Sequence, residues 1–161
     1  MPPELPDPLA DGRQSPAARD IARGTRRCLL AHGFASIPEL TLACGRRADI
    51  VALADGGEIW IVEVKSSLAD FRVDQKWPDY RDDCDRLFFA VAPDFPRDVL
   101  PDDTGLIIAD RFGAEIVRPA PEHKLSAARR KSVIARFSRA AALQLQAIAD
   151  PDLAREIARQ G

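Results

Sequence analysis

Hydrophobic and polar positions repeat with two different periods along the chain, and these periods predict its secondary structure. Between Ser15 and Gly33 the apolar residues recur every three or four positions, which is typical of an amphipathic helix. Ser15 is a favourable N-cap, Pro16 suits the first helical position, and Gly33 suits the position after the last turn. We therefore predict a helix over residues 16–32. Its inner side is expected to hold Ile21, Thr25, Cys28, Leu29 and His32, and its outer side Arg19, Arg23 and Arg26.

Runs of β-branched and other apolar residues follow this helix and predict strands. They cover Ile37–Ala43, Arg47–Ala54 and Glu58–Lys65, and Asp55-Gly56-Gly57 between the last two is a strong hairpin signal. Leu87–Ala92 is apolar on both faces, which suits a central strand covered on both sides. The chain therefore places one helix and three strands before a buried fourth strand.

Shorter signals complete the secondary structure. Ser67 with Asp70 resembles a capping box for a short helix, and a second short helix is expected from Pro78 to about Asp85. A less marked hairpin is expected from Leu106–Ala109 and Ala114–Arg118, and a long helix over residues 126–148 before a short terminal helix. The inner face of the long helix is expected to hold Ile134, Phe137, Ala141, Leu145 and Ile148.

Length and composition limit the chain to one domain. Its 161 residues, of which 46% are hydrophobic, are enough for one sizeable core. We predict a flexible proline-rich arm over residues 1–14, a single α/β domain over 15–149 with a mixed central sheet flanked by helices, and a short helix or tail over 150–161. The sequence has no apolar run of membrane-spanning length and no signal-like start, so a cytoplasmic protein is expected.

Charge and cysteine content exclude some site types. Cys28, Cys44 and Cys84 are an odd number at wide spacing, which argues against a disulfide framework and a structural zinc site, so we expect buried small hydrophobes. The net charge is −2, but residues 124–149 contain no acidic residue. The basic residues in that stretch are Lys124, Arg129, Arg130, Lys131, Arg136 and Arg139.

The hairpin around Asp55-Gly56-Gly57 brings two acidic residues together. If Ala54 pairs with Glu58, counting outward places Asp49 directly across from Glu63. Opposite side chains on neighbouring strands have Cβ atoms about 5 Å apart, and two like charges at that distance require a compensating cation. Strand alternation puts Lys65 on the same face as Glu63.

This arrangement suits phosphodiester hydrolysis with a divalent metal ion. Carboxylate oxygens from Asp49 and Glu63 and the backbone carbonyl of Val64 are ligands of the type that Mg²⁺ or Mn²⁺ prefers. A lysine beside them can orient water or stabilise developing charge. The alternative is an amphipathic sheet in which both carboxylates face solvent and Lys65 is their salt-bridge partner. The apolar flanks of these residues weigh against this alternative, because unpaired ions inside a buried sheet are costly.

One sequence pattern resembles the motif of the restriction-endonuclease-like PD-(D/E)XK superfamily: Asp49, thirteen intervening residues and then Glu63-Val64-Lys65. That resemblance implies an αβββαβ core, which the predicted element order reproduces, although Ala48 stands where the motif often has proline. A closer resemblance, to the MmcB-like DNA-repair proteins, covers residues 16–140 and implies DNA as substrate or ligand. It is carried by Arg46-Arg47-Ala48-Asp49-Ile50, Ile61-Val62-Glu63-Val64-Lys65-Ser66-Ser67 and the segment from Asp70-Phe71 to Cys84-Asp85.

The superfamily resemblance also suggests accessory site residues. Glu39 on the first strand is a candidate for a further metal-binding carboxylate, and Gln75 and Lys76 are candidates for contact with the scissile phosphate; ordinary surface roles are the alternative for all three. Trp77 and Tyr80 are spaced so that they either stack on an unpaired base or pack on the core. The basic residues expected to contact DNA phosphates are Arg19, Arg23, Arg46, Arg47, Arg129 and Arg136.

Two functions from different classes follow from these residues. The first is a DNA-repair nuclease that uses Mg²⁺ or Mn²⁺ bound by Asp49 and Glu63, assisted by Lys65. The second is a non-catalytic DNA-binding or scaffold module that keeps the nuclease fold beside other repair proteins. RNA processing on the same fold is a more distant third. A pure binder has no need of adjoining carboxylates, so the intact set of three residues favours the enzyme.

Overall fold

Helix α1 (Pro16–Ala31) begins where the sequence indicated, with the side chain of Ser15 accepting a hydrogen bond from the backbone N–H of Ala18. It is followed by Gly33 at a φ of 86°, a left-handed conformation that favours glycine. The computed structural model describes residues 14–160. Residues 1–13 of the predicted proline-rich arm, and Gly161 at the C-terminus, lie outside the described residues.

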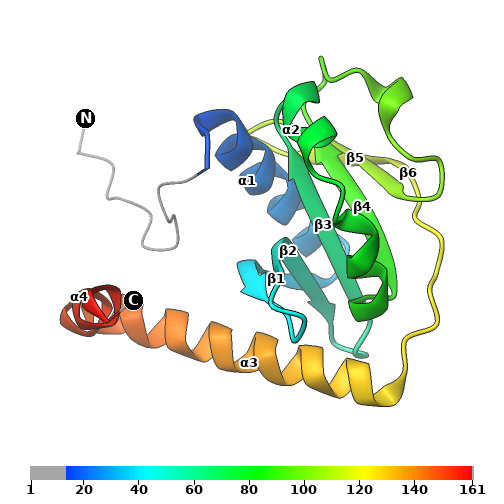
Figure 1. Ribbon diagram of the computed structural model, residues 1–161. Coiled ribbons are helices and arrows are strands. Elements are labelled where there is room, and N and C mark those ends of the chain that lie inside the picture. The colour runs from blue at the N-terminus through cyan, green and yellow to red at the C-terminus, as the bar shows by residue number, and fades with distance from the viewer. Residues whose placement is uncertain (1–13, 161) are drawn as a thin grey trace.

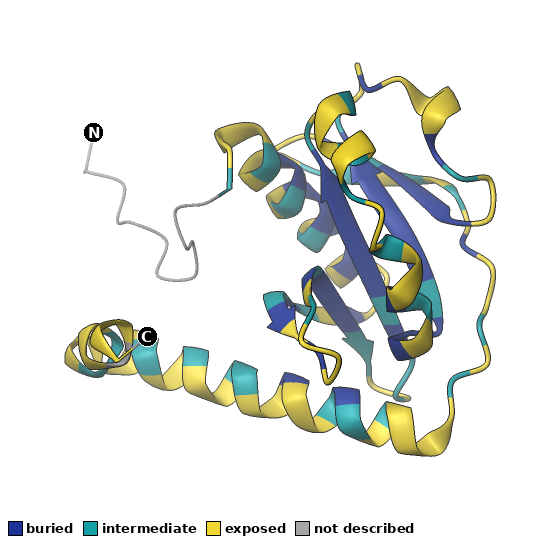
Figure 2. Ribbon diagram, viewed as in Figure 1, coloured by how far each residue is buried: buried dark blue, intermediate teal, exposed yellow. Residues whose placement is uncertain are grey.

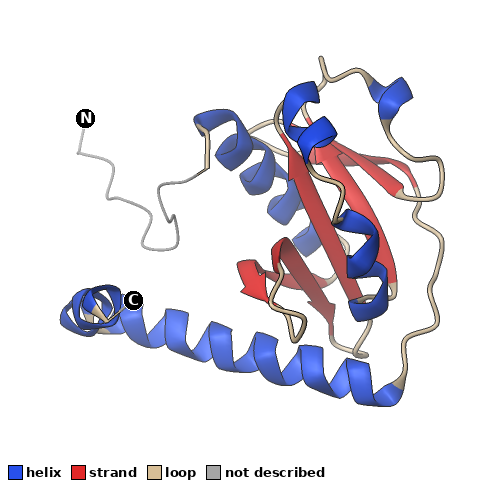
Figure 3. Ribbon diagram, viewed as in Figure 1, coloured by secondary structure: helices blue, strands red, loops and turns tan. Residues whose placement is uncertain are grey.

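Six strands form one mixed sheet in the order of the sequence (Figure 1). The neighbouring pairs β1–β2, β2–β3 and β5–β6 are antiparallel, whereas β3–β4 and β4–β5 are parallel (Figure 3). The predicted α/β fold with a mixed sheet flanked by helices is confirmed. The strands are β1 (Phe34–Thr41), β2 (Arg47–Ala54), β3 (Ile59–Lys65), β4 (Arg86–Val91), β5 (Gly105–Ala109) and β6 (Ala114–Arg118).

The register between β2 and β3 is the one that the hairpin signal predicted. Ile50 pairs with Val62 and Leu53 with Ile59, and the backbone N–H of Ala54 donates to the carbonyl of Glu58 at 3.0 Å. The same count continues outward to Asp49 and Glu63 at the ends of the two strands. The turn chemistry of Asp55-Gly56-Gly57 therefore determines which residues meet at the other end of the hairpin.

Helices cover the sheet on both faces. Ile21 and Leu29 of α1 pack with Val62 and Phe88 on one face. On the other face, Tyr80 and Cys84 from the region of η1 (Trp77–Asp83) and Val133 and Phe137 from α3 (Ala127–Ala149) pack with Ile61 and Leu87. Five of the six residues of β4 are buried, as expected for a strand covered on both sides. The shorter helices α2 (Leu68–Val73) and η2 (Arg97–Val99) lie in the connections on either side of β4.

Helix α3 packs against the sheet over residues 133–141. Phe137 is buried with 8% of its surface exposed, but Leu145 and Ile148 are 68% and 54% exposed, so the predicted inner face is wrong for these two residues. Figures 1 and 2 show the reason: the second half of α3 extends past the edge of the sheet, and α4 (Pro151–Arg159) follows at its end, mainly exposed. The periodicity of the sequence identifies an apolar stripe along α3. It does not show where the sheet that covers this stripe ends.

A partly buried ion pair fixes the start of α3 to the β2–β3 hairpin. Both guanidinium nitrogens of Arg130 donate to Asp85 at 2.7 Å, and Arg130 also donates to the carbonyl of Gly57 at 2.7 Å. Asp85 in turn accepts a hydrogen bond of 2.7 Å from the backbone N–H of Ile59. Because every link joins segments far apart in the sequence, this cluster holds the late helix against the hairpin that carries the acidic residues.

The expectation for the three cysteines is confirmed in part. Cys28 and Cys84 are buried as predicted, but Cys44 is exposed in the β1–β2 connection, so its assignment as a buried hydrophobe is wrong. Among the described residues, no helix combines the length and the apolar character needed to cross a membrane.

Candidate active site

Asp49 and Glu63 lie one residue beyond Ile50 and Val62, the last backbone pair between β2 and β3. Hydrogen bonds from backbone to side chain connect the two strands at this point. The backbone N–H of Asp49 donates to Oε1 of Glu63 at 3.1 Å, and the backbone N–H of Val64 donates to Oδ2 of Asp49 at 2.8 Å. Each acidic side chain is therefore held by the backbone of the opposite strand. The two carboxyl groups are also near enough for each to affect the pKa of the other.

Burial makes this carboxyl pair costly to ionise. Only 3% of the surface of Glu63 is exposed. Burial, and then the charge of Asp49, raise the pKa of Glu63 well above its usual value. Burial also raises the pKa of Asp49, although the hydrogen bond from Val64 and the charge of Lys65 oppose this. Two neighbouring carboxyl groups that are this hard to ionise are stabilised by a shared proton or by a bound cation.

Lys65 lies beside the carboxyl pair but is bonded to a different acid. Its ammonium group is 2.6 Å from Oδ2 of Asp74, which follows α2, and only 5% of the Lys65 side chain is exposed. Burial alone would lower the pKa of Lys65, but the hydrogen bond and charge of Asp74 raise it above its usual value. The amine is therefore protonated and fixed in place, two residues along β3 from Glu63.

These groups line a cavity of about 490 Å³ between the start of α1, the end of β3 and the segment after α2. Among the predicted residues, the cavity brings together Asp49, Glu63, Val64, Lys65, Arg47 and Tyr80. The other lining residues are Gln14, Ser15, Ala18, Ser66, Asp70 and Asp74.

Glu39 lies in the row of Asp49 and Glu63 but does not join their carboxyl pair. The β1–β2 register, in which Pro38 pairs with Ile50 and Leu40 with Ala48, places Glu39 across from Asp49. Its φ of 56° makes it the one non-glycine residue with positive φ among the described residues. Its carboxylate is 4.0 Å from the guanidinium of Arg47, at the rim of the cavity. Such backbone strain is common near functional sites.

The residues present fit a hydrated Mg²⁺ or Mn²⁺ ion rather than an enclosed metal centre. Within residues 14–160, no group of three or more His, Cys, Asp or Glu side chains is arranged to hold a metal ion, so Glu39 is not placed as a third carboxylate ligand. Mg²⁺ commonly uses one or two carboxylates and keeps several water molecules. The carboxyl groups of Asp49 and Glu63 supply this donor set, and Val64 lines the same cavity.

Of the residues predicted to contact the scissile phosphate or an unpaired base, Tyr80 lines the cavity, whereas Gln75, Lys76 and Trp77 are not among its lining residues. The side chain of Gln75 is exposed and donates to the carbonyl of Arg72, and Lys76 is also exposed. Trp77 packs edge-on against Phe89, and the guanidinium of Arg81 covers its ring. Tyr80 is buried with its hydroxyl donating to the carbonyl of Arg47 at 2.9 Å. Core packing, the alternative considered for Trp77 and Tyr80, is what the structure favours.

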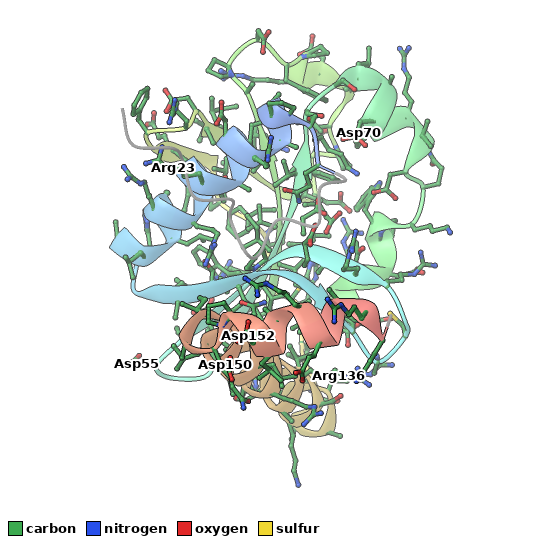
Figure 4. All side chains as sticks on the ribbon, turned by 90° about the vertical axis from the view of Figure 1, so that its left-hand side faces the viewer. Arg23, Asp55, Asp70, Arg136, Asp150 and Asp152 are labelled. Carbon is green, nitrogen blue, oxygen red and sulfur yellow. The ribbon has the colours of Figure 1, made fainter. Side chains whose placement is uncertain are left out.

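The predicted DNA-contacting arginines fall into two groups. Arg19 and Arg23 on α1 and Arg136 on α3 are exposed, and Figure 4 shows Arg23 and Arg136 on the side of the molecule that faces the viewer. Arg46 is 2.6 Å from Asp79, and Arg129 is 3.4 Å from the buried carboxylate of Asp83. The first group is available to a polyanion, whereas the second already serves ion pairs within the fold.

Sequence reasoning missed the residue that binds Lys65. From the sequence, no role is assigned to Asp74, and Asp70 is explained by the Ser67 cap alone. The cap is present, since Asp70 donates its N–H to Ser67 Oγ at 3.1 Å, but both acids also line the cavity. A signal was available: Asp74 lies near the end of a short helix that must return the chain beside β3.

Comparisons with known proteins relate the chain to one family and one solved structure. A family model described as "DNA repair protein MmcB-like" matches residues 5–152. The solved structure of the "SPO1766 protein of unknown function from Silicibacter pomeroyi" is 50% identical in sequence and has a TM-score of 0.83. The alignment covers 86% of this chain and 95% of that chain. No curated protein is found to match the chain.

Proposed function

The chain belongs to the MmcB-like family of DNA repair proteins, and from that premise we propose that it is a metal-dependent DNA nuclease. The observation that carries the proposal is the pair of carboxyl groups of the partly buried Asp49 and the buried Glu63, with the protonated amine of Lys65 beside it. A module that only bound DNA would gain nothing from two adjacent acids, one buried and one partly buried, because neighbouring like charges destabilise the fold.

The order of elements supports a restriction-endonuclease-like core. Helix α1, strands β1 to β3, helix α2 and strand β4 follow one another as in an αβββαβ arrangement. The acidic residues stand on β2 and β3, and the lysine stands two residues after the second acid, as in the PD-(D/E)XK motif that the sequence resembles. The resemblance therefore extends from the spacing of the motif to the strands that carry it.

Each residue of the proposed site has a distinct task. Asp49 and Glu63, with the carbonyl of Val64, are the groups that would hold Mg²⁺ or Mn²⁺, which when bound would activate water and neutralise charge on the phosphoryl group. Lys65 is fixed with its proton at Nζ, where it can orient the attacking water or donate to a developing oxyanion. Arg47, whose side chain is 43% exposed at the rim of the cavity, can contact a phosphate.

Cleavage assays test this proposal. Purified protein is incubated with plasmid, single-stranded and branched DNA in the presence of Mg²⁺, Mn²⁺ or a chelator. We expect product with the metals and none with the chelator. Asp49→Asn keeps an oxygen that can accept from Val64 N–H but removes the charge, and we expect this variant to lose cleavage on every substrate.

Asp55→Asn is the matched control. It makes the same chemical change in the same hairpin, but Asp55 lies in the exposed turn at the far end from the cavity (Figure 4). Equal cleavage by wild type and Asp49→Asn, or no metal-dependent product on any DNA, would overturn the proposal. DNA binding that survives chelator without cleavage would instead support a non-catalytic module.

A further inference from the structure

Lys65 and Asp74 form an ion pair that is anchored from both sides. Lys65 Nζ is 2.6 Å from Asp74 Oδ2, and the other carboxylate oxygen of Asp74 accepts from the backbone N–H of Lys76 at 2.9 Å. The backbone N–H of Asp74 donates to the carbonyl of Asp70, which ends α2. The carboxylate of Asp74 is therefore held by the backbone of Lys76 as well as by Lys65.

Several acidic residues lie near the amine of Lys65. Lysine carries a compact charge on a flexible chain, and a buried ammonium group requires a hydrogen-bonded counter-charge. The charges of Glu63 and Asp74 both favour the protonated amine, but among the described residues Asp74 is the one that hydrogen-bonds to it. Without the charge of Asp74, the remaining acids whose charges act on this amine are Glu63 and Asp49 of the candidate active site, and Asp70.

We propose that Asp74 is a positioning residue that holds the Lys65 ammonium group away from Asp49 and Glu63 and thereby keeps this carboxyl pair open to a divalent cation. If the amine moved to Glu63, it would supply the compensating charge itself and would compete with the metal ion for the same oxygens. The inference rests on the proposed function, because it concerns the same pair of acids.

A double-mutant cycle tests this inference by metal binding alone. Free Mn²⁺ is measured by electron paramagnetic resonance during titration of wild type, Asp74→Asn, Lys65→Met and the double variant. We expect Asp74→Asn to weaken Mn²⁺ binding by about fivefold or more in the presence of Lys65, and to have no effect once Lys65 is methionine. A residue that acts only through its own negative charge would weaken binding equally in both backgrounds.

Asp79→Asn is the matched control for charge in this segment. Asp79 lies on η1 and pairs with Arg46 at 2.6 Å, so its loss removes a nearby negative charge without touching Lys65. We expect this variant to bind Mn²⁺ like the wild type. Circular dichroism verifies that each variant is folded, and Asp74→Ser replaces Asp74→Asn in the cycle if the latter does not fold.

The outcomes separate this inference from the proposed function. Unchanged affinity in Asp74→Asn, equal effects in the two backgrounds, or no Mn²⁺ binding by the wild type would each overturn the positioning role. A protein that gives the expected cycle but cuts no DNA would retain this inference and lose the nuclease activity. A protein that cuts DNA but gives equal effects would lose only the inference.

Discussion

The backbone N–H of Asp49 donates a hydrogen bond of 3.1 Å to Oε1 of Glu63, so the two acidic residues are linked directly across the ends of β2 and β3. This bond explains how two carboxyl groups persist side by side in a buried place. The backbone offers each of them a donor, while burial raises the pKa of both. The site is therefore held together by the sheet and is costly to leave ionised.

The first prediction concerns how much the buried carboxylate of Glu63 destabilises the folded protein. Glu63→Gln is expected to raise the thermal midpoint of the metal-free protein at neutral pH, because it keeps the acceptor for Asp49 N–H and removes a buried charge. Each kcal/mol gained corresponds to a rise of about 2–4 °C for a domain of this size. Scanning calorimetry measures the change, and Asp55→Asn serves as the exposed control. A lower midpoint for Glu63→Gln would contradict the prediction.

The second prediction concerns metal ions and stability. Mn²⁺ or Mg²⁺ is expected to raise the midpoint of the wild type, since an ion that binds only the folded state adds about 2.7 kcal/mol at a concentration of 100 times its Kd. The same addition is expected to leave Asp49→Asn nearly unchanged. Thermal unfolding with and without metal measures both, and an equal shift in the variant would place the ion elsewhere.

The third prediction concerns the ion pair between Asp85 and Arg130. The side chain of Asp85 is 7% exposed and that of Arg130 is 32% exposed, so we expect Asp85→Ala to cost about 2–3 kcal/mol, below the value of 3–5 kcal/mol for fully buried pairs. Chemical denaturation measures the loss. Asp152→Ala breaks the exposed pair with Arg155 and is expected to change little.

The same ion pair makes the stability of the folded protein depend on pH. Burial opposes ionisation of Asp85, but the hydrogen bonds and charge of Arg130 and the N–H of Ile59 outweigh it and lower the pKa of this carboxyl below its usual value. Its contribution to stability is therefore fully present above the unfolded pKa of about 3.9 and is lost as the pH falls through the folded pKa. Asp85→Asn is expected to lose less stability than the wild type over that acidic range. The free energy of unfolding of both proteins is measured by chemical denaturation at several pH values. Parallel plots of this free energy against pH would contradict a lowered pKa for Asp85.

The fourth prediction concerns the contact between α1 and the β5–β6 hairpin. A Cβ atom at Gly24 would lie 1.8 Å from the backbone carbonyl oxygen of Asp110, so no side chain fits without moving the helix. Gly24→Ala is expected to destabilise the fold by about 1–3 kcal/mol, although alanine has the higher helix propensity. Gly56→Ala, where nothing lies within 4 Å of the added atom, is the control. A stabilised Gly24→Ala protein would show that α1 packs differently.

The fifth prediction concerns the DNA-binding surface. Arg23→Gln and Arg136→Gln are expected to weaken DNA binding uniformly across sequences, because exposed arginines contact phosphates rather than bases. Each lost phosphate contact reduces the slope of log affinity against log salt by about 0.9. Fluorescence anisotropy at several salt concentrations measures the slope, and Arg155→Gln on α4 is the control. An unchanged slope would exclude these arginines from the interface.

Much of the fold follows from local sequence. The N-cap at Ser15, the Asp55-Gly56-Gly57 turn and the two-sided apolar run of β4 each gave the correct element, because turn and cap chemistry act within a few residues. The register of the hairpin even placed Asp49 across from Glu63, since a strand period of two leaves little freedom once the turn is known. The exposure of Leu145 and Cys44 did not follow, because it depends on where another element ends.

The sequence alone determined which acids stand at the ends of β2 and β3 and that Lys65 shares their face, because strand period and turn type are local properties. Only the tertiary structure decided which acid binds that lysine. Asp74 reaches Lys65 because α2 returns the chain beside β3, whereas Glu39 turns to Arg47. Partner choice among several nearby charges depends on distances of a few ångströms between separate elements, and no periodicity in the chain encodes these distances.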